Sequence, residues 1–295
     1  MSGAPGSRPR PADSAQVAIR ADSLLMGVTY ALGIGSALTV SVIATRVLSK
    51  SDVALLGWCL ASAMLLAVLA GLGTPQASIR LWTRTSSRGD PGQFARLLSI
   101  AATGTLVVVV VWWSVVGPAL VAAAEGDYAS GVPIVALWVP AGALMMLNEA
   151  AARSQMNFRL AAFCGDWVRR SLVVFGLALV GAGVFDVTTV LVSVAVVEFV
   201  LACGITLIVG GQRRGAWARS SVAGIVRDAR VAVAYLPPSL VAVLVPQAGV
   251  WLCALVASPN EVADLSIAIR ASFLVNVPFF VGGRVFAPRI ADADE

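Results

Sequence analysis

The chain has 295 residues, of which 58% are hydrophobic and 13% are charged, whereas soluble domains carry about 45–50% apolar and about 25% charged residues. A net charge of +5 would suggest a nucleic-acid partner in a soluble protein. Here the basic residues flank long apolar runs, where membrane orientation and contact with anionic headgroups explain them. We therefore expect an integral membrane protein with no nucleic-acid partner.

Eight apolar runs follow one another along the chain, each near the ~20 residues that a helix needs to cross a bilayer. They occupy residues 24–45, 53–73, 97–117, 132–148, 171–188, 190–210, 235–257 and 262–283. Residues 1–22 are rich in Gly, Ser, Pro and Ala, which predicts a disordered cytoplasmic tail before an uncleaved first span. The expected fold is all-α, with about eight transmembrane helices.

Arginine is distributed unevenly between the two sides of these runs. The odd-numbered connections hold only Arg46 and Lys50 as bases, together with several acids. By the positive-inside rule, the arginine-rich side is cytoplasmic, so we expect a multi-pass protein of the cell inner membrane with both termini in the cytoplasm. The bases on that side are Arg8, Arg10, Arg20, Arg80, Arg84, Arg88, Arg96, Arg153, Arg159, Arg169, Arg170, Arg213, Arg214, Arg219, Arg227, Arg230, Arg284 and Arg289.

Residues that support enzyme chemistry are scarce in the sequence. No histidine occurs, and the four cysteines show no C-x-x-C spacing, so neither a structural zinc site nor a histidine general base is expected. The phosphate-binding loop G-x-x-x-x-G-K-[ST] is also missing. We therefore expect a protein that is not an enzyme and that binds no metal or other cofactor.

Two helix junctions repeat a pattern at an offset of 209 residues. Residues 48–56 read LSKSDVALL and residues 257–265 read ASPNEVADL. The same offset places Gly73 on Gly282 and Arg80 on Arg289. This repeat predicts a first six-helix bundle over 23–210, a basic cytoplasmic linker over 211–230, and the first two helices of a second, parallel bundle over 231–295.

Several stretches resemble Wzx-type polysaccharide flippases, which belong to the multidrug/oligosaccharidyl-lipid/polysaccharide exporter superfamily. These stretches are ATRVLSKSDVALLG at 44–57, GLGTPQASIR at 71–80, ADLSIAIR at 263–270 and APR at 287–289. That family is built of two six-helix bundles, and this sequence supplies one bundle and two further helices. We expect a truncated product, a partial sequence or a shortened relative that completes itself by oligomerising.

The resemblance implies that the chain moves an undecaprenyl-diphosphate-linked saccharide from the cytoplasmic to the outer leaflet by alternating access. It implies as partners this lipid-linked substrate, membrane lipids, and a polysaccharide polymerase or glycosyltransferases. Two alternatives stay open at this point. One is a cation-coupled small-molecule exporter of the same superfamily, which would need acidic cavity residues. The other is a non-transporting membrane scaffold of a polysaccharide assembly complex.

Two charged residues lie deep inside apolar runs rather than near the ends of a run, and they are candidates for the substrate site. Arg270 lies about a third of the way into the last run by the helical rise, and its guanidinium offers bidentate donors to a diphosphate. The resemblance also implies a cavity arginine in this helix. Glu198 lies midway along 190–210. Three interpretations of it stay open: an ion-pair partner for Arg270, a proton-coupling acid with a raised pKa, or a neutral hydrogen-bonded group.

Uncharged polar residues complete the set of candidates. Gln247 and Asn276 are predicted at membrane depth, where interhelical hydrogen bonds or contacts with sugar hydroxyls explain them. Gln76, Arg80 and Arg84 follow the second run at the expected cytoplasmic mouth. They are interpreted either as first contacts for an anionic lipid headgroup or as bases that only orient the chain.

Two further patterns concern the membrane interface. Residues 151–170 mix arginines with apolar residues at helical spacing, which predicts a cytoplasmic connection containing an interfacial amphipathic helix. The adjacent Trp112 and Trp113 are typical of an aromatic belt near the outer interface.

Overall fold

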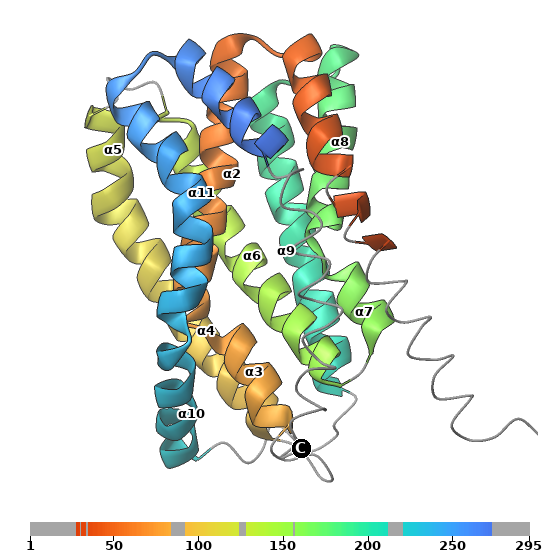
Figure 1. The fold of residues 1–295 in the computed structure, drawn as a ribbon, viewed down its shortest axis with the longest axis vertical. Helices are drawn as coiled ribbons and strands as arrows, with labels where there is room; N and C mark the ends of the chain where they lie inside the picture. Colours follow the sequence, from red (N-terminus) through yellow and green to blue (C-terminus); the bar gives the residue numbers. More distant parts are fainter. Residues whose placement is uncertain are drawn as a thin grey trace, which may run out of the picture.

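A computed structural model describes residues 28–29, 31–33, 35–83, 92–123, 128–155, 157–211 and 221–272, and all regular structure in these residues is helical (Figure 1). The named helices are α2 (Lys50–Gly71), α3 (Thr74–Thr83), α4 (Gly92–Val111), the π-helical turn η1 (Trp112–Val116), α5 (Gly117–Ala123), α6 (Gly131–Ser154), α7 (Phe158–Phe163), α8 (Asp166–Gly181), α9 (Val187–Gly211), α10 (Val222–Ala234) and α11 (Leu236–Val256). Further helices cover 31–47 and 259–272.

Four of the described helical segments are long and apolar enough to cross a membrane. They are Lys50–Gly71, Gly92–Ala123, Gly131–Ser154 and Val187–Gly211. A fifth arises if Val222–Ala234 and Leu236–Val245, which meet at a bend of 40°, form one span. The predicted all-α membrane fold is therefore confirmed, whereas the total of eight spans stays a prediction.

Helices α2 and α6 form the centre of the bundle. Helix α6 packs against α2, α3 and α9, and α2 also contacts α4 and α11 (Figure 1). Both helices are buried over most of their length. Such helices are apolar all round because neighbouring helices, rather than lipid or water, surround them.

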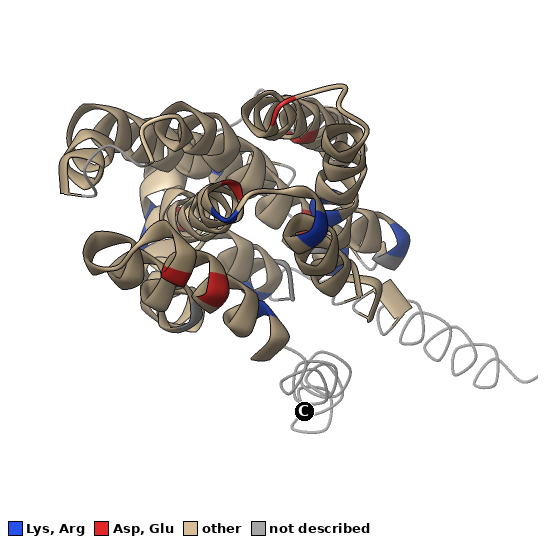
Figure 2. Cartoon of the chain, turned by 90° about the horizontal axis from the view of Figure 1, so that it is seen from above, with Lys and Arg blue, Asp and Glu red and all other residues tan. Residues whose placement is uncertain are grey.

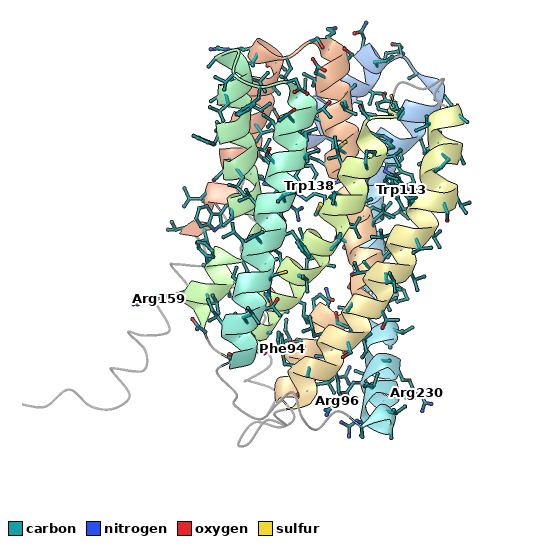
Figure 3. The ribbon with its side chains drawn as sticks, turned by 180° about the vertical axis from the view of Figure 1, so that it is seen from behind. Phe94, Arg96, Trp113, Trp138, Arg159 and Arg230 are labelled. Carbon is teal, nitrogen blue, oxygen red and sulfur yellow. The ribbon has the colours of Figure 1, made fainter. Side chains whose placement is uncertain are left out.

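Several arginines lie at one end of the bundle. Seen from above, most of the described ribbon is uncharged, and Lys, Arg, Asp and Glu occupy only short stretches of it (Figure 2). Arg96, Arg159 and Arg230 all lie toward the end formed by α3, α7 and α10, which we call the α10 end (Figure 3). This grouping agrees with the uneven arginine distribution in the sequence.

The two copies of the sequence repeat begin their helices in the same way. At the start of α2, the backbone N–H of Asp52 donates to Ser49 Oγ at 3.2 Å. At the equivalent place before the helix 259–272, the backbone N–H of Ser258 donates to Glu261 Oε2 at 2.9 Å. Both are halves of a capping box, in which a serine and an acid three residues later satisfy free N–H groups of the first turn.

These two helices also touch at equivalent residues. Gly57 on α2 and Ser266 are 209 positions apart, and a methyl group on Gly57 would lie 2.8 Å from the Cβ of Ser266. Val53 and Val262, which are also equivalent, are both buried in the same apolar cluster. A side chain at position 57 would collide with the side chain of Ser266, so glycine allows the two helices to approach closely here.

The expectation of an aromatic belt was wrong for Trp112. Trp112 is 1% exposed and donates from Nε1 to the Val132 carbonyl at 3.0 Å, so it belongs to the core rather than to an aromatic belt. Its ring lies 5.7 Å from Trp58 and 6.0 Å from Trp251 between centroids. Trp113, by contrast, is 56% exposed. The helical phase explains this, because neighbouring residues point about 100° apart around a helix.

The segment 151–170 also differs from the expected cytoplasmic connection. Helix α6 extends to Ser154, α7 occupies Phe158–Phe163, and α8 already begins at Asp166. Arg169 and Arg170 therefore lie in the first turns of α8 instead of in a loop before it. This becomes possible because a carboxylate inside the bundle neutralises one of them, as described below.

The turn between α2 and α3 is closely covered by α10. Gly73 has a φ of +75°, and a methyl group there would overlap the carbonyl oxygen of Ala232 at the end of α10. Gly183, between α8 and α9, has a similar φ of +70° but open space around it.

We therefore expect Gly73→Ala to lower stability much more than Gly183→Ala. Both variants carry the cost of about 1–2 kcal/mol for an L-residue at positive φ, and Gly73→Ala adds roughly 1–3 kcal/mol for displacing α10. Thermal unfolding of the detergent-purified chain measures the difference. Equal loss in the two variants would show that α10 does not pack on this turn.

Candidate functional site

A single carboxylate lies in the middle of α9 and is fully satisfied by its neighbours. Glu198 is 1% exposed. It accepts hydrogen bonds from Arg169 Nε at 2.9 Å to each carboxylate oxygen and from Arg169 Nη2 at 2.7 Å. It also accepts one from Trp138 Nε1 at 2.6 Å. Removing a carboxylate from water is tolerated only with such partners, so this pair with its tryptophan joins α6, α8 and α9.

The local sequence of α6 makes room for this pair. Trp138 and Gly142 lie one helical turn apart and therefore on the same face. A methyl group on Gly142 would lie 3.0 Å from Arg169 Nη2 and 2.9 Å from the Cβ of Ala67. The glycine thus lets the guanidinium lie against the helix backbone while Trp138 supplies the extra donor.

The pair formed by Glu198 is different from the one considered in the sequence analysis. Its partner is Arg169, not Arg270. Two donor nitrogens of Arg169, Nε and Nη2, make three contacts with the Glu198 carboxylate, and Trp138 Nε1 makes a fourth.

Arg270 lies in the last described turns of the helix 259–272. Its Nη1 and Nη2 atoms are buried and have no hydrogen-bond partner among the described residues. The rest of the side chain is half-buried. A methyl group on Gly57 would lie 3.9 Å from Arg270 Nη2, so this guanidinium lies beside the crossing of α2 with the second copy of the repeat.

A second cation acts on the Arg270 guanidinium. Arg170, next to Arg169 in α8, lies within electrostatic range of Arg270 and repels it. Arg170 itself donates from Nη1 to the Gly33 carbonyl. Among the described residues, Arg169 is paired with Glu198, and the like charge of Arg170, the next residue, acts on Arg270. The arrangement favours a negatively charged group beside Arg270.

The other candidate residues lie apart from this charged centre. Gln247 on α11 is half-buried, and its Nε2 makes a weak contact with Met64 Sδ at 3.8 Å. Gln76 and Arg80 are exposed on α3, at the α10 end. Asn276 and Arg84 lie outside the described residues.

Sequence reasoning missed three members of the charged centre: Arg169, Arg170 and Trp138. The two arginines directly precede the apolar run 171–188, which made them look like residues of a connection. The one available signal was the rule that a carboxylate inside the membrane needs a cationic or hydrogen-bonding partner. Applied to every nearby arginine rather than to Arg270 alone, that rule would have included Arg169.

One solved structure gives an independent view of the fold. The chain is similar to the MATE multidrug transporter DinF-BH, solved in complex with R6G, with a TM-score of 0.70 and 15% sequence identity. The match covers 97% of this chain and 67% of that one. At this identity the likeness concerns the fold alone. The sequence matches no family model and no curated protein.

The ion pair yields a direct test of the charged centre. Replacing Glu198 by Gln removes the carboxylate that pairs with the buried Arg169 guanidinium, and we expect a loss of about 3–5 kcal/mol in the free energy of unfolding. Replacing both residues by apolar ones, Glu198→Leu with Arg169→Met, should recover much of this loss, because no charge is then buried.

Asp264→Asn is the matched control, because Asp264 pairs with Lys50 at 3.8 Å where both side chains are exposed. This substitution should cost only about 0.2–1 kcal/mol. Thermal unfolding in detergent compares the variants. A Glu198→Gln protein as stable as the control would contradict the assigned pairing.

Proposed function

We propose that this chain is a membrane transporter that moves a lipid-diphosphate-linked saccharide across the cytoplasmic membrane for polysaccharide biosynthesis. The observation that carries the proposal is Arg270, whose two terminal nitrogens are buried without a partner among the described residues. A desolvated guanidinium of this kind is costly unless an anion neutralises it. A substrate phosphate supplies that anion.

The chemistry of the guanidinium fits a diphosphate. Its planar set of N–H donors matches two phosphate oxygens at once, and charge-assisted bonds of this type are stronger than neutral ones. Arg170 adds a second positive charge in range of Arg270. A diphosphate carries more than one negative charge, so both cations would lower the cost of holding it inside the membrane.

The remaining candidates have subsidiary roles in this proposal. Glu198 serves as the counter-ion of Arg169 and so keeps that cation in place near the substrate. Gln247 and Asn276 offer hydrogen bonds to saccharide hydroxyls. Gln76, Arg80 and Arg84 form the cytoplasmic entrance for the anionic lipid. In this orientation both termini lie in the cytoplasm, and the arginines of the α10 end face the same side.

A second candidate function is cation-coupled export of a small molecule. The similarity of the fold to a MATE multidrug transporter supports it. Such a function requires a carboxylate that is free to bind a cation or a proton. Among the described residues, Glu198 is the carboxylate in the charged centre, and it already receives hydrogen bonds from Arg169 and Trp138. The charge balance therefore favours the anionic substrate.

In cells that depend on this chain for a surface polysaccharide, Arg270→Ala should reduce surface polymer roughly ten- to hundredfold, because a hydrogen-bonded charge pair to the substrate is lost. Lipid-linked precursor should accumulate inside. Arg270→Lys should be intermediate, because it keeps the charge and loses the bidentate geometry. Polymer is measured together with the amount of folded protein in the membrane.

Arg159→Ala, which removes an exposed arginine of α7, is the matched control and should leave the polymer unchanged. Normal polymer in both Arg270 variants, at normal protein levels, would refute the role of Arg270 in the substrate site.

A further inference from the structure

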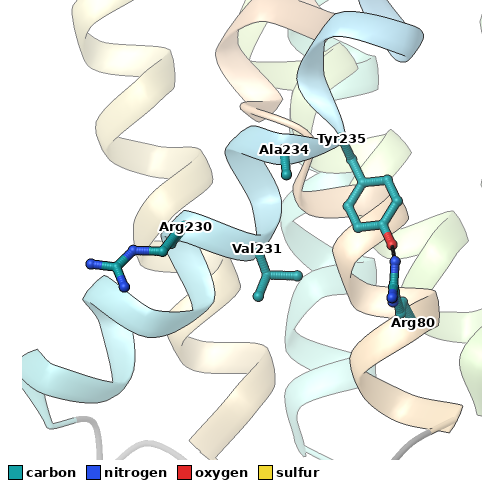
Figure 4. A pocket seen from close by; sticks show the side chains of 5 residues that line it. All are labelled: Arg80, Arg230, Val231, Ala234 and Tyr235. Atoms are coloured by element: carbon teal, nitrogen blue, oxygen red, sulfur yellow. Dashed lines mark hydrogen bonds between the residues drawn. The ribbon is translucent and has the colours of Figure 1, made fainter.

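A small surface pocket lies where α10 ends and α11 begins. Its volume is about 390 Å³, and it is lined by Arg80, Arg230, Val231, Ala234 and Tyr235 (Figure 4). Four of these residues are spaced as neighbours on one face of the last turn of α10, and Arg80 comes from α3. The pocket thus combines an apolar floor with a cation on either side.

Arg80 is held in place although it is exposed. One of its terminal nitrogens donates to the hydroxyl of Tyr235, and its guanidinium carbon lies 5.7 Å from the centroid of the Tyr235 ring (Figure 4). The second contact is within the range of a cation–π interaction. A guanidinium fixed in this way loses little conformational entropy when it binds an anion.

The opposite side of the pocket is more open. Arg230 is exposed and points away from Tyr235 in this structure (Figure 4). Val231 and Ala234 lie between the two arginines (Figure 4). A ligand that fits this arrangement has an anionic group next to the cations and an apolar part over the floor.

Helix α10 exposes both apolar side chains and arginines next to the pocket. Val222, Val226 and Val233 are 77%, 54% and 50% exposed. They recur at intervals of four and seven residues, which places them along one side of the helix. Exposed apolar residues beside arginines are typical of helices that lie in the headgroup layer of a bilayer.

A buried ion pair holds this surface in a fixed position. Arg96 Nε on α4 donates to Asp228 Oδ2 at 2.6 Å, and the two side chains are 5% and 1% exposed. A methyl group on Gly224 would lie 2.9 Å from the Cδ of Arg96, so α10 lies directly on this arginine. The pocket is therefore part of a helix anchored to the bundle rather than of a loose segment.

We propose that this pocket binds the headgroup phosphate of an anionic phospholipid. Arg80 and Arg230 supply the positive charge, Val231 and Ala234 lie under the glycerol and upper acyl region, and the valines of α10 lie in the surrounding lipid. The site is separate from the charged centre around Arg270, but it shares Arg80 with the entrance proposed above for the lipid-linked substrate. Binding of a membrane phospholipid here does not depend on what the chain transports. Its ligand is a lipid of the leaflet at the α10 end.

The test uses the full chain purified in a neutral detergent, with thermal unfolding and native mass spectrometry as readouts. Phosphatidylglycerol should stabilise the protein and remain bound, and phosphatidylcholine, which has no net charge, should do so less. Arg80→Gln and Arg230→Gln should each weaken phosphatidylglycerol binding roughly fivefold, and the double variant roughly thirtyfold. Arg159→Gln, the matched surface variant, should bind as the unmodified chain does.

Two further controls are needed. One distinguishes a lipid phosphate from a free phosphate, and the other distinguishes lost binding from a failure to fold. Glycerol 3-phosphate and inorganic phosphate should give no comparable stabilisation, and equal stabilisation would overturn the assignment to a lipid. Tyr235→Phe removes one bond to Arg80 and keeps the ring, so it provides a mild variant if Arg80→Gln fails to fold. Equal binding of the two phospholipids, or undiminished binding in Arg230→Gln, would overturn the proposal.

Discussion

The ion pair between Arg169 and Glu198 is the interaction on which the interior of this protein depends. It joins three helices at a depth where neither charge is tolerated alone, and Trp138 fills the remaining acceptor position of the carboxylate. The ion pair also determines which charges inside the bundle are neutralised. Because Glu198 is committed to Arg169, it is not the counter-charge of Arg270. In the part of the chain that the structure describes, the buried terminal nitrogens of Arg270 therefore have no hydrogen-bond partner, and this is why an anion is proposed beside them.

Arg270 lies where the two copies of the sequence repeat meet. Its guanidinium lies beside the place where α2 meets the helix 259–272, and these helices touch at Gly57 and Ser266, which are equivalent in the two copies. In the transport function proposed above, contacts between the copies would change during the cycle. A substrate held at this crossing would then be in contact with both copies. Lys50 and Asp264 make a further contact between the same helices, 3.8 Å apart at the surface.

Much of the fold was predictable from the sequence, and the reasons are physical. Long apolar runs must be helical in a membrane because every backbone group needs an internal partner, and the all-α membrane fold is confirmed. The repeat was visible because residues 48–56 and 257–265 match at a constant offset of 209 residues. The phase of each helix was harder to predict. Trp112 and Trp113 look equivalent in the sequence, yet one is buried and the other exposed.

The candidate site was only partly predictable, because the sequence does not show which helices are neighbours or which of their faces meet. Arg270 and Glu198 stood out because charge in an apolar run is rare. Their pairing depends on which helices are neighbours, and the sequence contains no local signal that α8 lies beside α9 with Arg169 opposite Glu198. The boundary of α8 was also misplaced, because an arginine pair before an apolar run is normally the end of a membrane span. The roles of Gln247, Asn276 and the entrance residues stay predictions.

Direct binding of a polyprenyl diphosphate to the purified chain tests the central claim. The matched polyprenol and a lipophilic rhodamine cation would be measured beside it, in the unmodified chain and in Arg270→Met. The account predicts that the diphosphate binds more tightly than either comparison ligand, and that Arg270→Met weakens diphosphate binding roughly tenfold or more without changing polyprenol binding. Tighter binding of the cation, or diphosphate binding that is indifferent to Arg270, would contradict it.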